Sequence, residues 1–85
     1  MKIIRISAIW CSSCIIMKSR FNEVIKDYDI EVIDYDYDLD SDIVDEYKVG
    51  NILPVYIKGN DRLIGEHSKE ELKEFIERWY YEKVN

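Results

Sequence analysis

The first third of the chain shows the hydrophobic pattern of a strand followed by a helix. Residues 2–9 form an apolar, β-branched run with little alternation, which is typical of a central strand covered on both faces. From residue 14 onward, apolar side chains recur at steps of three and four, which predicts an amphipathic helix of about four turns. The apolar positions of that helix are Cys14, Met17, Phe21, Val24 and Tyr28.

An alternating pattern over residues 30–37 predicts a second strand. Apolar and aromatic side chains occupy one of its faces, whereas the other face carries Asp34 and Asp36. Charged side chains discourage a strand from pairing with another molecule, so we expect this strand at the edge of the sheet.

A short helix and a hairpin are expected next. Asp40 or Ser41 can cap the helix, and the pair Gly50-Asn51 can end it. A turn that begins at Gly59 contains residues that tolerate a positive φ, and it separates two brief runs of strand-forming residues. The two runs are residues 55–58 and 62–66.

The last helix begins with a capping box, Ser68 to Glu71. Its apolar face ends in a cluster of aromatic residues that is expected to complete the core or to support a weak dimer. The face consists of Leu72, Phe75, Ile76, Trp79 and Tyr80, with Tyr81 beside it. The predicted order, β-α-β-α-β-β-α, indicates a single α/β domain over residues 1–85 with one parallel βαβ unit.

The charge of the chain argues against nucleic-acid and membrane partners. Its 12 Lys and Arg are scattered among 18 Asp and Glu, which gives a formal net charge of −6. No run approaches the roughly 18 apolar residues of a membrane span. Arg5 interrupts the short apolar N-terminus, and Trp10 occupies the position where a lipoprotein-type signal needs a small residue, so we expect a cytoplasmic protein.

Cys11 and Cys14 are the only cysteines, and they lie where the strand pattern gives way to the helix pattern. A disulfide across so short a loop stabilises a fold by only about 2 kcal/mol, against about 5 kcal/mol for a loop of a hundred residues. Redox chemistry explains the pair better, because the free N–H groups and dipole of a helix N-terminus stabilise a thiolate. The spacing places Cys14 one turn from Cys11, ready to attack a mixed disulfide. Such a pair needs no cofactor.

Two metal hypotheses fit the sequence less well. Zinc needs two ligands beyond the cysteines, and with His67 as the only histidine it would require a dimer. The aspartates of residues 34–42 alternate, but an EF-hand loop needs Gly and Glu where this chain has Leu39 and Asp45. We interpret these aspartates as protection of an edge strand and as anions near a helix start. His67 has no evident acid–base partner and is expected at the surface.

Three features together resemble the thioredoxin superfamily over essentially the whole chain. They are Trp10-Cys-x-x-Cys after the first strand, Pro54 at the entry to the third strand, and Gly65 before the last capping box. The chain lacks the first strand and helix of ordinary thioredoxins. The resemblance therefore implies a minimal thioredoxin fold, in which helices flank a central four-stranded mixed sheet, as in glutaredoxins and the smallest thioredoxin-like proteins.

The resemblance also implies roles for individual residues. Cys11 would be the exposed nucleophile and Cys14 the resolving thiol. Pro54, which could otherwise be an ordinary strand-opening proline, would be cis and face the disulfide. Trp10 would pack on the first helical turn and form a flat wall beside the reactive sulfur, and the backbone of Leu53 would pair with an extended substrate. The implied substrate-binding residues are Trp10, Ser12, Ser13, Leu53, Pro54 and Gly65.

Departures from the family pattern concern the chemistry. Ser12 and Ser13 stand where thioredoxins usually carry Gly-Pro and glutaredoxins Pro-Tyr, so neither group indicates the redox potential. Arg5 stands about where thioredoxins keep a buried acid that helps to deprotonate the second cysteine. We expect Arg5 to pair with Asp34 or Asp36, or to help hold a thiolate. The loop before Pro54 is one residue longer than usual.

The sequence thus predicts a monomeric thiol–disulfide oxidoreductase that reduces protein disulfides by dithiol exchange. Its electrons would come from a thioredoxin-reductase-type flavoprotein or from glutathione. Two alternatives stay open: a glutathione-dependent, glutaredoxin-like enzyme, and a non-catalytic binding module on a thioredoxin scaffold.

Overall fold

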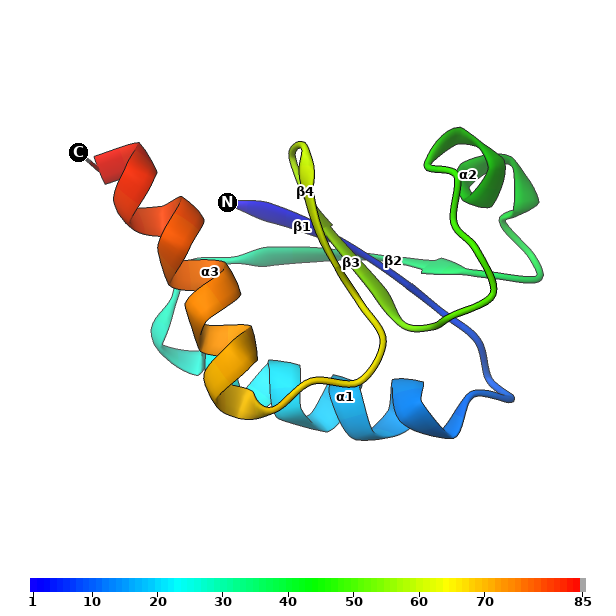
Figure 1. Ribbon diagram of the computed structural model, residues 1–85, viewed down its shortest axis with the longest axis horizontal. Coiled ribbons are helices and arrows are strands. Elements are labelled where there is room, and N and C mark those ends of the chain that lie inside the picture. The colour runs from blue at the N-terminus through cyan, green and yellow to red at the C-terminus, as the bar shows by residue number, and fades with distance from the viewer. Residues whose placement is uncertain (85) are drawn as a thin grey trace.

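The computed structural model describes the backbone of residues 1–84 and the side chains of residues 1–78 (Figure 1). Its elements follow the predicted order, with one short 3₁₀ turn, η1, after the first helix. They are β1 Lys2–Ser7, α1 Ser12–Val24, η1 Ile25–Asp27, β2 Glu31–Asp36, α2 Ser41–Glu46, β3 Val55–Lys58, β4 Asp61–Ile64 and α3 Lys69–Val84.

The four strands form one mixed sheet in the order β2-β1-β3-β4. β1 pairs with β2 in parallel and with β3 antiparallel, and β3 and β4 form the antiparallel hairpin. The prediction of a central first strand and an edge second strand is therefore confirmed. Helices α1 and α3 cover one face of the sheet, and α2 lies over the other (Figure 1). This is the minimal thioredoxin fold that the resemblance implies.

Alternation along the strands divides the core into two clusters. Ile3 and Tyr56 point to the face under α1 and α3, where they pack with side chains such as Phe21. Ile6 points to the opposite face and packs with residues of β3 and α2. Both cysteines belong to this second cluster, at the end of the molecule where β1 leads into α1.

Three elements end earlier than the sequence predicted. β1 ends at Ser7 and not at residue 9, because the chain turns there and the Cys11 N–H bonds to the Ala8 carbonyl at 3.2 Å. The first helix ends at Val24, and the tighter turn η1 redirects the chain toward β2 before Tyr28. β4 stops at Ile64, because Gly65 has a φ of +86°, outside the range of strands.

The second helix ends earlier than predicted. The helix is terminated by Lys48, which has a φ of 53°, and not by Gly50. The Lys48 N–H bonds to the Asp45 carbonyl and the Val49 N–H to the Val44 carbonyl, the paired bonds of a Schellman motif. At the start of α2, Asp40 occupies the cap position, but its side chain accepts a hydrogen bond from the Asp36 N–H and none from the helix.

The capping box of α3 is confirmed. Ser68 Oγ accepts from the Glu71 N–H at 3.2 Å, and Glu71 Oε1 accepts from the Ser68 N–H at 3.1 Å. The aromatic side chains expected to complete the core or a dimer, Trp79, Tyr80 and Tyr81, lie outside the described side chains. Within residues 1–84, no helix is both long and apolar enough to cross a membrane.

Candidate active site

Cys11 occupies the N-cap position of α1. Its backbone is extended, with φ −96° and ψ 108°, and its Sγ accepts a hydrogen bond from the Cys14 N–H at 3.2 Å. The sulfur thus takes the place that a Ser or Asp oxygen usually takes at a helix start. A negatively charged sulfur is a stronger acceptor than a thiol, and the helix dipole also favours a negative charge there. The local geometry therefore places an N–H donor and the positive end of the helix dipole at Cys11 Sγ.

The expectation that Cys11 is exposed is wrong. Its side chain belongs to the apolar cluster, and the residue is 9% exposed, compared with 5% for Cys14. The cause is the loop before β3, whose Leu53 carbonyl accepts a hydrogen bond from Cys11 Sγ at 3.8 Å. Both cysteines are free thiols.

Cys14 lies one turn further along α1 and is held as a thiol. Burial is the main cause that raises its pKa to about 12, and a hydrogen bond with Cys11 adds to this shift. A hydrogen bond with the Ala8 backbone acts in the opposite direction. At neutral pH, Cys14 is therefore protonated and unsuited to be the first nucleophile.

The loop at Pro54 is held beside Cys11 by the end of β4. The Leu53–Pro54 peptide bond is cis, which agrees with the resemblance. The Pro54 carbonyl accepts a hydrogen bond from the Gly65 N–H at 2.9 Å. A Cβ at Gly65 would lie 3.4 Å from Ile52 Cγ2, so the two segments pack closely. The fold thus brings Cys11, the Leu53–Pro54 loop and Gly65 together from three separate segments.

Trp10 contacts the loop after β2 through a hydrogen bond and a ring contact. Its Nε1–H donates a hydrogen bond to Asp38 Oδ2 at 2.7 Å, and its ring packs edge-on against Tyr37 with centroids 6.2 Å apart. The residue is nevertheless 61% exposed. Sequence reasoning did not identify Asp38, because nothing in the local pattern indicates which acid of the loop meets Trp10.

Ser12 and Ser13 form the first turn of α1 between the cysteines. Ser12 is exposed and Ser13 is partly buried. Their role in binding a substrate stays a prediction.

Arg5 does pair with Asp34. Its Nε donates to Asp34 Oδ1 at 2.5 Å and its Nη2 to Asp34 Oδ2 at 3.0 Å. On the other side Arg5 is the cross-strand neighbour of Tyr56. Among the described residues, the buried Arg5 Nη1 and Tyr56 Oη have no partner at good hydrogen-bond geometry, although the two groups interact electrostatically. Burial lowers the pKa of Arg5, but its interactions with Asp34 and Tyr56 together raise it by more. Arg5 thus stays charged and cannot accept a proton.

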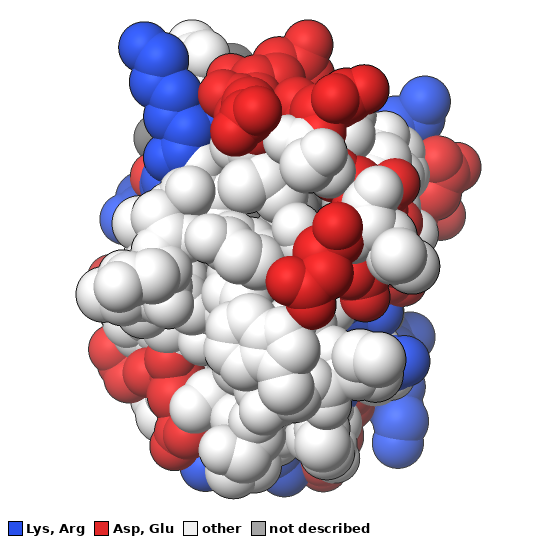
Figure 2. Space-filling view, turned by 90° about the vertical axis from the view of Figure 1, so that its right-hand side faces the viewer, with Lys and Arg blue, Asp and Glu red and all other residues white. Residues whose placement is uncertain are grey.

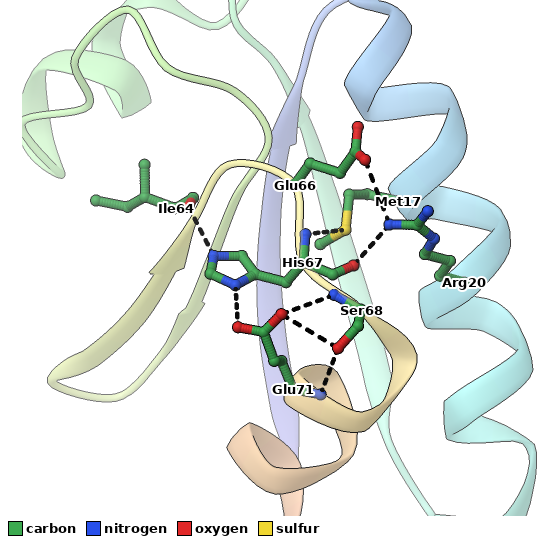
Figure 3. A network of polar contacts seen from close by, with 7 residues as sticks. All are labelled: Met17, Arg20, Ile64, Glu66, His67, Ser68 and Glu71. Carbon is green, nitrogen blue, oxygen red and sulfur yellow. Dashed lines mark hydrogen bonds and ion pairs between the residues drawn. The ribbon is translucent and has the colours of Figure 1, made fainter.

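His67 is not the isolated surface residue that the sequence suggested. Figure 3 shows its ring between two acceptors, with Nδ1 3.1 Å from Glu71 Oε2 and Nε2 2.9 Å from the Ile64 carbonyl. Its backbone N–H donates to Met17 Sδ, and its carbonyl accepts from Arg20 Nη1 (Figure 3). The network fastens the segment before α3 to α1 and does not include a cysteine.

Metal ligands do not gather elsewhere in the fold. Among the described residues, no group of three or more His, Cys, Asp or Glu side chains is placed to hold a metal ion.

Comparisons with known proteins agree with this geometry. Thioredoxin 1 of Thermosipho africanus has a similar structure, with a TM-score of 0.84 at 22% identity and complete coverage of both chains. Mitochondrial thioredoxin 3 of Saccharomyces cerevisiae matches 91% of this chain and 76% of its own, with a TM-score of 0.78 at 26% identity. A malaria-parasite protein, thioredoxin-2, matches 91% of this chain and 81% of its own, with a TM-score of 0.80 at 20% identity.

The sequence comparisons give two results. No curated protein sequence matches the chain. The family model described as Thioredoxin matches residues 1–78. Because this match covers nearly all of the sequence and the structure has the same fold, the chain belongs to the thioredoxin family.

Proposed function

We propose that this protein is a thiol–disulfide oxidoreductase that reduces protein disulfides through Cys11 and Cys14. The family and the fold support a thioredoxin-like redox function in general. The observation that carries the specific proposal is the hydrogen bond from the Cys14 N–H to Cys11 Sγ at the start of α1, 3.2 Å long. This hydrogen bond places a donor at Cys11 Sγ, where negative charge is needed for exchange, while burial keeps Cys14 protonated.

The reaction proceeds in two exchange steps. The Cys11 thiolate attacks one sulfur of the substrate disulfide, the substrate S–S bond breaks, and the other substrate sulfur leaves as a thiolate that takes a proton from water. Cys14 then attacks Cys11 Sγ in the mixed disulfide and expels the second substrate thiolate. The substrate gains two electrons and two protons, and the protein is left with a Cys11–Cys14 disulfide.

The second step has to remove a proton from Cys14. No carboxylate occupies the position of Arg5, and neither its guanidinium nor the Tyr56 hydroxyl is a base at neutral pH. We infer that the Cys14 proton passes to water or directly to the departing substrate thiolate, which is the strongest base at the site.

The loop at Pro54 provides the docking edge for the substrate. The Leu53 carbonyl faces Cys11 Sγ at 3.8 Å, so an extended segment that pairs with the Leu53 backbone places its sulfur beside Cys11. Trp10 forms a wall of the same site, and Ser12, Ser13 and Gly65 adjoin it. The proposal includes a cytoplasmic monomer, since redox-active cysteine pairs are kept reduced there.

The electron donor in this proposal is a thioredoxin-reductase-type flavoprotein. Glutathione is the second candidate and would make the protein glutaredoxin-like. Its carboxylates need basic partners, whereas residues 35–47, from the end of β2 through α2, contain no Lys or Arg. A non-catalytic binding module is the third candidate, and it would not require the Cys11 geometry.

Reduction of insulin disulfides tests the proposal. Wild-type protein is expected to catalyse the reaction with dithiothreitol, Cys11→Ser to be inactive, and Cys14→Ser to accumulate a mixed disulfide detectable by intact mass. Full activity of Cys11→Ser would refute the mechanism. Turnover with glutathione and its reductase, but not with thioredoxin reductase, would favour the glutaredoxin-like alternative.

A further inference from the structure

The negative charge of the chain is concentrated in one segment. Ten of the 18 acidic residues lie between Asp27 and Glu46, a stretch without Lys or Arg. The last six of these run from the end of β2 through α2, which lies at the same end of the molecule as the loop between β1 and α1 (Figure 1). We call them the acidic rim: Asp36, Asp38, Asp40, Asp42, Asp45 and Glu46.

Within the described residues, the acidic rim makes no ion pair. All six ion pairs found among the described residues lie elsewhere. Asp36 and Asp40 accept backbone N–H groups that shape the loop, and Asp38 accepts from Trp10. The remaining three, Asp42, Asp45 and Glu46, are exposed on α2. Their negative potential therefore projects into solvent.

An apolar surface adjoins the acidic rim. Five large hydrophobic side chains on the segments around Cys11 are between 60% and 87% exposed. They are Ile9, Trp10, Ile15, Leu39 and Ile52. Figure 2 shows this end of the molecule as a broad uncharged face, bordered above and at one side by acidic residues. Exposed apolar area of this kind marks a surface that another protein covers.

One hydrogen bond links the apolar surface to the acidic rim. Trp10 belongs to the apolar surface and Asp38 to the acidic rim, and they meet at 2.7 Å. A segment that reaches Cys11 past Trp10 therefore passes Asp38, which belongs to the acidic rim, and charges act over about 8 to 10 Å at physiological salt.

We propose that this combined surface selects protein partners whose reactive disulfide lies in an apolar segment flanked by Lys or Arg. The inference rests on the proposed function and names the substrate class of the same site. Apolar residues of the partner cover the surface around Trp10, while its basic residues lie against Asp42, Asp45 and Glu46. Such complementary charge raises the association rate, and salt reduces the gain. Partners with acidic flanks are repelled.

Two peptides with the same intramolecular disulfide ring and the same apolar residues, one flanked by Lys and one by Glu, test the proposal. Their rates of reduction by the reduced protein are measured by stopped flow at low and at high salt. We expect the Lys-flanked peptide to react about tenfold faster or more at low salt, with the preference shrinking at high salt. Replacing the apolar residues of the Lys-flanked peptide by Ser is expected to slow its reduction.

Matched variants of the protein locate the effect. Asp45→Asn with Glu46→Gln removes two charges of the acidic rim, and the preference for Lys is expected to fall severalfold. The control, Asp29→Asn with Glu74→Gln, also removes two exposed negative charges, but from the end of the sheet before β2 and from α3. It is expected to keep the preference.

The outcomes separate the inference from the proposed function. If the wild-type protein reduces neither peptide nor insulin, the proposed function fails and the inference falls with it. If it reduces both peptides at equal rates, or if the acidic-rim variant keeps the full preference, the function stands and the inference is overturned.

Discussion

Arg5 and Asp34 face each other across β1 and β2, joined by two hydrogen bonds between the guanidinium and the carboxylate. The two partners differ in exposure, because the Arg5 side chain is 6% exposed and the Asp34 side chain 55%. Losing the exposed partner leaves a buried charge without a counterion, whereas losing the buried partner leaves a carboxylate that water can solvate.

This asymmetry predicts that Asp34→Ala is more damaging than Arg5→Leu. We expect Asp34→Ala to lower the free energy of unfolding by about 1 to 3 kcal/mol, the cost of removing a hydrogen-bond partner from a charged group. Arg5→Leu is expected to cost less, because it removes the buried charge and leaves an Asp34 carboxylate that water can solvate. Urea denaturation followed by circular dichroism measures both. A larger loss for Arg5→Leu would contradict the assignment.

The buried acids Cys14 and Tyr56 predict a loss of stability at alkaline pH. Burial is the main cause that raises the pKa of each to about 12, from ordinary values of 9.0 and 10.0. Between those values and 12 the unfolded chain has lost its protons and the folded protein has kept them. The unfolded state then binds fewer protons, so the free energy of unfolding falls as the pH rises.

Two variants isolate this effect in urea titrations at neutral and alkaline pH. Tyr56→Phe is expected to reduce the alkaline loss and to be near neutral or stabilising at pH 7, because Tyr56 Oη is buried and makes no hydrogen bond of good geometry within the described residues. Cys14→Ser is expected to reduce the alkaline loss as well. The interpretation fails if both variants follow the pH dependence of the wild type.

The order of elements could be predicted because each element carries a signal in its own residues. The alternation of residues 30–37 indicated β2, the steps of three and four indicated α1, and the Ser68 to Glu71 box marked the start of α3. The motif around the cysteines and Pro54 was enough to suggest the family.

Features that depend on distant contacts could not be predicted. The burial of Cys11 results from a carbonyl 42 residues away, and the partner of Trp10 lies 28 residues away. The end of α2 at Lys48 was missed for a local reason. A lysine at positive φ costs about 1 to 2 kcal/mol, so the nearby Gly50 was the expected stop.

His67 predicts a contribution to stability that is lost as the pH rises. Burial lowers its pKa, but the bonds to the Glu71 carboxylate and the Ile64 carbonyl raise it by more, so the net shift is upward from 6.5. A raised pKa means that the folded state holds the proton more tightly. The contribution is therefore complete below pH 6.5 and disappears as the pH rises through the folded pKa.

Titration of the His67 ring by NMR in wild type and in Glu71→Gln checks this prediction. Glutamine retains the capping box with Ser68 but removes the negative charge beside Nδ1. The midpoint of His67 is expected to lie above 6.5 in the wild type and to move down in the variant. An unchanged midpoint would show that the carboxylate does not hold the ring.

Gly65 combines a constrained backbone with a place next to the proposed docking edge. Its φ is +86°, and its N–H donates to the Pro54 carbonyl at 2.9 Å. Alanine at this position would be strained, and its Cβ would lie 3.4 Å from Ile52 Cγ2. We expect Gly65→Ala to cost about 1 to 2 kcal/mol of stability in urea denaturation. Its rate of insulin reduction is also expected to fall, because the loop that faces Cys11 must shift.

Gly50→Ala provides the matched control. A Cβ at Gly50 meets nothing within 4 Å, and its φ lies outside the left-handed region. This variant is expected to be neutral or to stabilise the protein by about 0.4 to 1 kcal/mol, since alanine reduces the freedom of the unfolded chain. It should also reduce insulin at the wild-type rate. If Gly65→Ala kept full activity despite its loss of stability, the bond between Gly65 and Pro54 would be structural only, because the loop beside Cys11 would then tolerate displacement without affecting exchange.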